Sequence, residues 1–192
     1  QAMLEADPYL AHNLTEIERS AAEAMTIMRD SLYHLRPIRV VPVDIAECVA
    51  EAINTTDLPV GVHVRQERLS SLPPVAAGPR RLALVFANLL ENAAAAMEGQ
   101  GMITVSGALV GNWVEVSVTD TGPGILPELH ERIFDFNFSS RKAHAGKLGF
   151  GLWWVKTLMA RFGGSVAVQS DGQHSTTFIL KLPAEPASSP TR

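Results

Sequence analysis

Residues 88–93 read NLLENA and lie within a segment, 78–97, whose apolar side chains recur at helical spacing. Asn88 and Asn92 are four residues apart, so both project from one side of the predicted helix, at the edge of its apolar face. Two amide oxygens in that position can hold a magnesium ion that shares its shell with substrate phosphates. Such a pair is also common on plain polar helix surface, so its interpretation depends on the segments around it.

A second segment, residues 120–125, reads DTGPGI and follows a predicted strand. Gly122 and Gly124 permit positive φ angles and a close approach of the backbone to a ligand. The Asp120 carboxylate at the mouth of this turn can accept a hydrogen bond from an exocyclic amine such as that of adenine. A tight turn that needs two glycines explains the segment equally well.

A third segment, residues 146–152, reads GKLGFGL and opens a predicted helix over 151–162. A glycine loop that leads into a helix N-terminus presents unpaired N–H groups and the positive end of the helix dipole, which favours phosphate. No strand precedes this loop, so it is not the dinucleotide fingerprint, and it lacks the Lys-Ser/Thr ending of a P-loop. The segment therefore predicts a nucleotide site of another kind.

The order of these segments resembles the N, G1 and G2 boxes of an ATP-binding domain shared by sensor histidine kinases, gyrase-type topoisomerases, heat-shock-90 chaperones and mismatch-repair ATPases. Residues 133–142, IFDFNFSSRK, are similar to the Phe-rich F box of histidine kinases. The resemblance covers residues 37–183 and favours a sensor histidine kinase. It implies an α+β fold of the Bergerat type, a two-layer α/β sandwich in which helices cover one face of a mixed sheet and ATP lies between the N-box helix and a mobile lid.

The resemblance also implies roles for individual residues. Asn92 would ligate Mg²⁺ with help from Asn88, and Asp120 would accept the adenine amine with support from Thr176. Phe134 and Phe138 would anchor the lid. The implied ATP-binding residues are Asn88, Asn92, Asp120, Gly122, Gly124, Lys142, Lys147, Gly149, Gly151, Leu152 and Thr176.

Two positions depart from the family pattern. Many G2 boxes begin Gly-Thr-Gly, whereas this chain has Lys147-Leu148, and Ala95 stands where many relatives carry a basic residue. Phosphate neutralisation then falls to Lys142, Arg141 or Lys147, which the sequence does not rank. The same three cations could simply solvate a loop.

The remaining secondary structure follows from periodicity and turn residues. Helices are predicted over 44–53, with Asp44 as the N-cap, and over 127–134, followed by a loop over 135–150. Strands are predicted over 60–69, 102–108, 113–119, 165–170 and 175–182, the last four as two hairpins around Gly111-Asn112 and Asp171-Gly172.

The first 36 residues carry apolar side chains in a four-three alternation that is typical of a helix packed along another helix. Given the resemblance, residues 1–36 look like the second helix of a dimerisation and phosphoacceptor hairpin, whose first helix is missing. A helix that folds back onto the globular part is the alternative. Residues 184–192 are expected to be a frayed tail.

Composition narrows the class of protein. The chain has 192 residues, 46% of them hydrophobic, and 16 Lys and Arg against 20 Asp and Glu, a net charge of −4. This balance supports a packed core and argues against a nucleic-acid footprint. Cys48, the single cysteine, is expected to be a buried inert thiol. No apolar run is long enough for a membrane span, so a cytoplasmic location is expected for this chain. The Gln1 start suggests a piece of a longer protein, whose missing part could carry a membrane anchor.

The expected reaction transfers the γ-phosphate of Mg-ATP to a histidine on the missing helix, then to an aspartate of a response-regulator receiver domain. The full-length protein is expected to be a homodimer. His12 only faintly resembles the phosphoacceptor box, so no phosphoacceptor and no catalytic residue is assigned, and this chain is expected to bind ATP without phosphorylating itself. The alternatives are a degenerate nucleotide-binding module that regulates a partner, and a serine kinase of the anti-sigma type.

Overall fold

The computed structural model describes residues 13, 37–136, 138 and 150–185. The chain divides into two compact units, residues 1–38 and 39–192. The long helix predicted over 1–36 lies outside the described residues, apart from Asn13, which is helical. The second unit holds all the elements described below.

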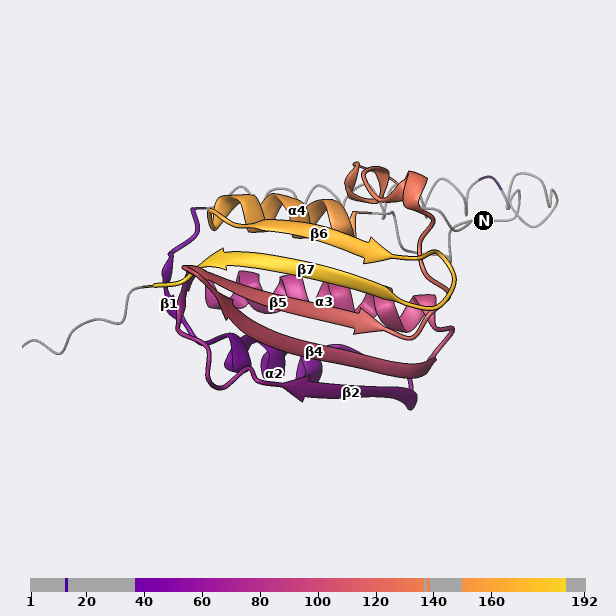
Figure 1. Ribbon diagram of the computed structural model, residues 1–192, viewed down its shortest axis with the longest axis horizontal. Coiled ribbons are helices and arrows are strands. Elements are labelled where there is room, and N and C mark those ends of the chain that lie inside the picture. The colour runs from indigo at the N-terminus through magenta and orange to yellow at the C-terminus, as the bar shows by residue number, and fades with distance from the viewer. Residues whose placement is uncertain (1–12, 14–36, 137, 139–149, 186–192) are drawn as a thin grey trace, which may run out of the picture. The chain divides into compact units, whose positions relative to one another are not determined.

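A five-stranded sheet forms one layer of the second unit (Figure 1). Its order is β2 (Gly61–Glu67), β4 (Gln100–Val110), β5 (Trp113–Asp120), β7 (Thr176–Pro183) and β6 (Ser165–Ser170). The β2–β4 pair is parallel and the other three pairs are antiparallel. The predicted mixed sheet is confirmed, and both predicted hairpins are present.

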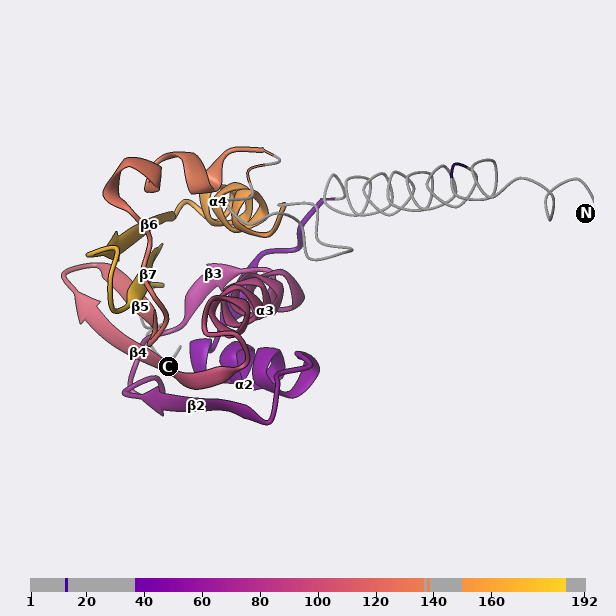
Figure 2. The same ribbon diagram turned by 90° about the vertical axis from the view of Figure 1, so that its right-hand side faces the viewer.

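Three helices lie on one face of this sheet, as Figure 2 shows: α2 (Ile45–Thr55), α3 (Pro79–Ala96) and α4 (Gly151–Arg161). Asp44 caps α2 as predicted, since its Oδ1 accepts a hydrogen bond from the Ala46 N–H at 2.7 Å. Pro79 opens α3, where its missing N–H removes no helical hydrogen bond. The arrangement is the two-layer α+β sandwich that the sequence predicted.

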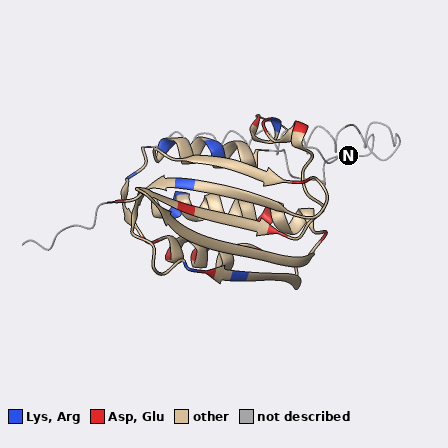
Figure 3. Ribbon diagram, viewed as in Figure 1, with Lys and Arg blue, Asp and Glu red and all other residues tan. Residues whose placement is uncertain are grey.

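The core lies between the sheet and the helices. Alternate residues of β5 and β7 are buried, as period-two patterning requires for a sheet with one covered face. The largest fully buried side chains include Phe86, Leu89 and Leu90 of α3 and Leu180 and Leu182 of β7. Acidic and basic residues are interspersed over the described elements (Figure 3), with Lys181 and Glu115 paired at 2.7 Å across β7 and β5.

The structure adds two strands that sequence patterning missed. β1 (Val41–Val43) pairs antiparallel with β3 (Val75–Ala77) in a separate two-stranded sheet. Each strand has three residues, too few for an alternating pattern to be visible in the sequence. The helix predicted over 127–134 is instead two short 3₁₀ helices, η1 (Pro127–Leu129) and η2 (Arg132–Phe134).

The first two residues of the predicted tail are hydrogen-bonded to other parts of the second unit. The Ala184 N–H donates to the Asn112 carbonyl and the Glu185 N–H to the Pro74 carbonyl, both at 2.9 Å. Residues 186–192 lie outside the described part of the chain.

Candidate functional site

One side of α3 carries the first group of site residues. Asn88 and Asn92 are both half-buried, and Ala96 follows them at the same four-residue spacing, so the three lie on one side of the helix. Asn88 Nδ2 donates to the Leu84 carbonyl at 2.9 Å, one turn earlier. Asn92 Nδ2 is buried and has no hydrogen-bond partner among the described residues. Buried amides are normally hydrogen-bonded, so this Nδ2 atom is a candidate contact for a ligand.

The N-terminus of α4 abuts this row of amides. A Cβ atom on Gly151 would lie 2.9 Å from Asn88 Oδ1 and 3.6 Å from Asn92 Nδ2, so any side chain there would displace Asn88. No side chain among the described residues caps α4, whose N-cap residue is Phe150. The first turn of α4, with the half-buried Leu152, therefore brings its backbone N–H groups beside the Asn88 and Asn92 amides.

Asp120 forms the second group, at the end of β5. Its side chain is buried (3% exposed), and its Oδ1 accepts a hydrogen bond from the Gly122 N–H at 2.8 Å. Thr176 pairs with Asp120 across β5 and β7 and is 2% exposed, so both face the helix-covered side of the sheet. A Cβ on Gly122 would lie 2.8 Å from Asp120 Oδ1 and 3.3 Å from the Ala96 Cβ. Glycine at 122 thus lets the turn pack against both Asp120 and α3.

The two groups are connected along α3. Gly151 lies against Asn88, and Gly122 lies against Ala96, eight residues further along the same side of the helix. At 1.5 Å per residue the two ends are about 12 Å apart. One end therefore carries a helix N-terminus and side-chain amides, and the other end carries a buried carboxylate. This arrangement fits an elongated ligand that has a phosphate at one end and an amine at the other.

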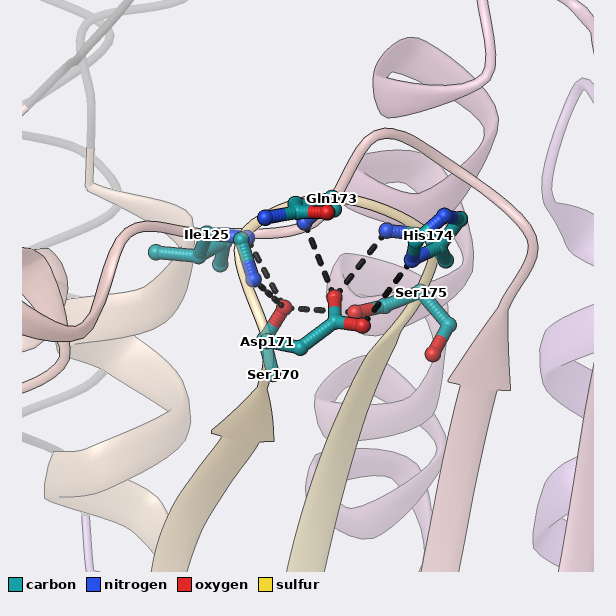
Figure 4. A network of polar contacts seen from close by, with 7 residues as sticks. Ile125, Ser170, Asp171, Gln173, His174 and Ser175 are labelled. Atoms are coloured by element: carbon teal, nitrogen blue, oxygen red, sulfur yellow. Dashed lines mark hydrogen bonds and ion pairs between the residues drawn. The ribbon is translucent and has the colours of Figure 1, made fainter.

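The turn that contains Gly124 packs on the β6–β7 turn (Figure 4). Gly124 has a φ of +81°, and a Cβ on it would lie 2.8 Å from both Ser170 Oγ and the Gln173 nitrogen. The Ile125 N–H donates to Ser170 Oγ at 2.9 Å. Sequence reasoning missed Ser170, because nothing in its local sequence distinguishes it from other serines at strand ends.

The aromatic residues before the loop pack against α4 and β7. Phe134 is buried and meets Phe178 edge-on, with ring centroids 6.2 Å apart. Arg132 stands 5.3 Å from the Phe138 ring centroid. A cleft of about 590 Å³ opens beside them; none of the implied ATP-binding residues lines it, and its lining is Phe134, Asp135, Phe136, Trp153, Lys156, Thr157, Ala160 and Arg161.

Several predicted residues lie outside the described part of the chain: Arg141, Lys142, Lys147 and Gly149. Cys48 is buried as predicted, and burial raises the pKa of its thiol to about 12, with nearby carboxylates adding to the rise. No group of three or more His, Cys, Asp or Glu side chains that could hold a metal ion occurs among the described residues.

Residues 77–186 match the protein family described as "Histidine kinase-, DNA gyrase B-, and HSP90-like ATPase". The chain belongs to this ATPase family. The match spans the α3 amides, the Asp120 turn and the N-terminus of α4, and it confirms the predicted resemblance. No helix among the described residues of this ATPase domain is long and apolar enough to cross a membrane.

Characterised relatives of the ATPase domain are sensor kinases. It is 34% identical over 148 residues to the sensor-like histidine kinase SenX3 of Mycobacterium tuberculosis, which covers 74% of this chain and 36% of SenX3. It is 34% identical over 122 residues to the sensor histidine kinase ZraS of Escherichia coli, covering 64% of this chain and 26% of ZraS. The chain thus spans about a third or less of these relatives.

Solved structures share the fold. Full-length ShkA in complex with AMPPNP superposes with a TM-score of 0.74 at 24% identity, over 97% of this chain and 41% of ShkA. The mycobacterial sensor histidine kinase MprB gives a TM-score of 0.66 at 24% identity, over 77% of this chain and 99% of that one. These likenesses confirm the fold of a histidine kinase ATPase domain.

Proposed function

We propose that the chain is the ATP-binding catalytic domain of a two-component sensor histidine kinase. The observation that carries this proposal is the arrangement along α3, with Gly151 against Asn88 at one end and the Asp120 turn against Ala96 at the other. The separation of about 12 Å along the helix suits an extended nucleoside triphosphate. The proposal places the domain in the cytoplasm, where ATP is available.

The base of ATP is assigned to the Asp120 end. A buried carboxylate can accept a hydrogen bond from the 6-amino group of adenine, whereas guanine has a carbonyl oxygen at the same position, which cannot donate. Thr176 lies beside Asp120 in the cross-strand register and supports the same contact. Gly122 lets the turn pack closely against Asp120 and α3, and Gly124 lets it pack against the β6–β7 turn, so that backbone of the turn lies beside the proposed base position.

The phosphates are assigned to the other end. Uncapped N–H groups in the first turn of α4, from Gly151 and Leu152, favour anionic oxygens through hydrogen bonds and the helix dipole. Lys142, Lys147 and Gly149 belong to the same proposed site and carry phosphate contacts by resemblance.

Magnesium fits the donors present. Asn88 presents its Oδ1 toward α4, whereas Asn92 presents its Nδ2 there. That nitrogen has no hydrogen-bond partner among the described residues, so a flip of the Asn92 amide would offer its Oδ1 to a cation beside Asn88. Mg²⁺ accepts such oxygen ligands together with phosphate oxygens. When bound, it would offset the charge that develops on the transferred phosphoryl group.

The proposed reaction needs a histidine from outside this chain. An imidazole nitrogen of that histidine forms a bond to the γ-phosphorus while the bond to the β–γ bridging oxygen breaks, and the imidazole proton is released with ADP as the other product. The phosphoryl group then passes to a receiver-domain aspartate of a response regulator. The family membership and the sensor kinases among the relatives support this sequence. The full-length protein is proposed to be a homodimer, as the resemblance implies.

The test has two arms. Calorimetry with Mg-AMPPNP, followed by a crystal structure of the complex, should find nucleotide with its adenine amine on Asp120. Mixing the chain with γ-labelled ATP and a complete phosphoacceptor hairpin should place acid-labile label on the hairpin, and no label on the chain incubated alone. Absence of nucleotide binding would overturn the proposal.

A regulatory module without phosphotransfer is a second candidate, favoured by two departures from the family pattern. Ala95 is exposed on α3 where many relatives carry a basic residue, and Lys147-Leu148 changes the G2 box. Nucleotide binding of ordinary affinity without any label on the supplied hairpin would favour this candidate. Acid-stable label would instead indicate a serine kinase.

A further inference from the structure

Ser170 ends β6 and belongs to the same cross-strand row as two proposed base-site residues. The row runs Ser170, Thr176, Asp120 across β6, β7 and β5. Cross-strand partners share a face of the sheet, and Asp120 and Thr176 are buried toward the helices. The half-buried Ser170 side chain therefore lies on the face that carries the proposed base site, at its outer end.

The Ser170 hydroxyl joins three backbone groups. It accepts hydrogen bonds from the Ile125 N–H at 2.9 Å and from the Gly172 N–H at 3.3 Å, and it donates to the Ser175 carbonyl (Figure 4). Its two acceptor lone pairs and one proton are thus all used. Ile125 belongs to the turn of the proposed base pocket, whereas Gly172 and Ser175 belong to the β6–β7 turn. One side-chain atom holds the two turns together.

The turn of the proposed base pocket, residues 122–126, is hydrogen-bonded at two points and packs closely on the β6–β7 turn. His130 Nε2 lies 3.0 Å from the Ile125 carbonyl, so both backbone polar groups of Ile125 are bound by side chains. Gly124 has no space for a Cβ against Ser170, and a Cβ on Gly172 would lie 3.3 Å from Leu126 Cδ2. The position of residues 122–126 therefore depends on the β6–β7 turn as well as on their own conformation.

We infer that Ser170 is a positioning residue for adenine-nucleotide binding, which holds the Gly122–Ile125 turn in its ligand-ready position through the Ile125 N–H. This inference rests on the proposed function of the site. Without the hydroxyl, the Ile125 and Gly172 N–H groups lose their acceptor and the turn samples more conformations before the base binds. Because Ser170 acts at the base end, the effect falls equally on ATP and ADP.

Ser170→Ala tests the inference, with Ser175→Ala as a matched control, because Ser175 enters the network through its backbone carbonyl. Affinities of the full chain for Mg-AMPPNP and Mg-ADP are measured by calorimetry. We expect Ser170→Ala to weaken both by the same factor, about 3- to 10-fold, which is the worth of one net hydrogen bond. Ser175→Ala should stay within about twofold of wild type.

Amide exchange supplies a readout that general destabilisation would not reproduce. In Ser170→Ala the Ile125 amide should exchange faster in the absence of nucleotide, while amides of β5 and β7 keep their wild-type protection. Ser170→Thr, which retains the hydroxyl, should restore both the Ile125 protection and the affinity. If Ser170→Ala does not fold, Ser170→Cys replaces it, since sulfur is a weak acceptor of similar size.

The outcomes separate the two proposals. If the wild-type chain binds no nucleotide, the proposed function is overturned. If the Ile125 amide exchanges at the wild-type rate in Ser170→Ala, the positioning role of Ser170 is overturned, whatever the affinities are. If the wild type binds nucleotide and Ser170→Ala binds it with the same affinity as the wild type, this inference is overturned and the proposed function still stands. A loss confined to AMPPNP would place the effect at the phosphates and would also overturn it.

Discussion

Gly151, the first residue of α4, lies so close to Asn88 of α3 that a Cβ on it would be 2.9 Å from Asn88 Oδ1. The Asn88 amide is itself tied back to its own helix, because its Nδ2 donates to the Leu84 carbonyl at 2.9 Å. The uncapped N-terminus of α4 and the α3 amides thus meet without any side chain between them. This contact brings the proposed phosphate-binding N–H groups beside the proposed metal-binding amides, at one end of the proposed site.

Gly151→Ala tests that contact. The added methyl must displace Asn88 or push the start of α4 outward, so we expect affinity for Mg-AMPPNP to fall about tenfold or more. Stability should change little, since Ala is better than Gly within a helix by about 0.5–1 kcal/mol and offsets the strain. Calorimetry and thermal unfolding measure the two effects.

A glycine elsewhere provides the control for Gly151→Ala. Gly111 has a φ of +61° and nothing within 4 Å of a built Cβ, so Gly111→Ala strains the backbone without touching the site. It should lower the free energy of unfolding by about 1–2 kcal/mol and leave nucleotide affinity unchanged. Wild-type affinity in Gly151→Ala would show that the contact is irrelevant to binding.

Asn92→Ala separates a ligand-binding amide from a structural one. Because Asn92 Nδ2 is buried without a partner among the described residues, its removal should not destabilise the free protein and can raise the free energy of unfolding by about 1 kcal/mol. The dependence of AMPPNP affinity on Mg²⁺ should be lost. Titrations with Mg²⁺ and with a chelator measure this, and a variant that keeps full Mg²⁺ dependence would remove Asn92 from the metal site.

Asp120→Asn replaces the proposed acceptor of the adenine amine by a group of the same shape. A hydrogen bond to a charged group is worth about 1.5–3 kcal/mol, so nucleotide affinity should fall about 10- to 100-fold. Glu115→Gln on the same strand is the control, because Glu115 pairs with Lys181 away from the proposed site. Equal affinities in the two variants would contradict the assignment of Asp120.

Asp171 supplies a pH-dependent contribution to stability. Its pKa is lowered from 3.8 to about 2, first by the hydrogen bond between Asp171 Oδ2 and His174 Nδ1, which are 3.0 Å apart. Hydrogen bonds that Asp171 Oδ1 accepts from the backbone N–H groups of Gln173 and His174 lower the pKa further. A depressed pKa stabilises the fold above pH 3.8, and this contribution is lost as the pH falls toward 2. The unfolding midpoint in urea should therefore fall less steeply over this range in Asp171→Asn than in wild type. Parallel curves would contradict the role of Asp171.

Local patterning predicted most elements of the fold. The apolar spacing of 78–97 and the Asp44 cap are readable because helix formation depends on residues three and four apart. Hairpins with turns at Gly111 and Gly172 are equally local, and both glycines have positive φ in the structure. The prediction of a single helix over 127–134 was wrong, because a pattern this short does not distinguish an α-helix from two 3₁₀ helices.

The sequence by itself determined the helices, the hairpins and the order of the Asn, Asp-Gly and Gly-rich segments, because each depends on neighbours along the chain. Only the tertiary structure placed Asp120, Thr176 and Ser170 in one cross-strand row, because β5 pairs with the distant β7. It also set Gly151 against Asn88 and joined Ile125 to Ser170. Cross-strand register and helix contact are decided by the packing of the whole core, which no local run of residues encodes.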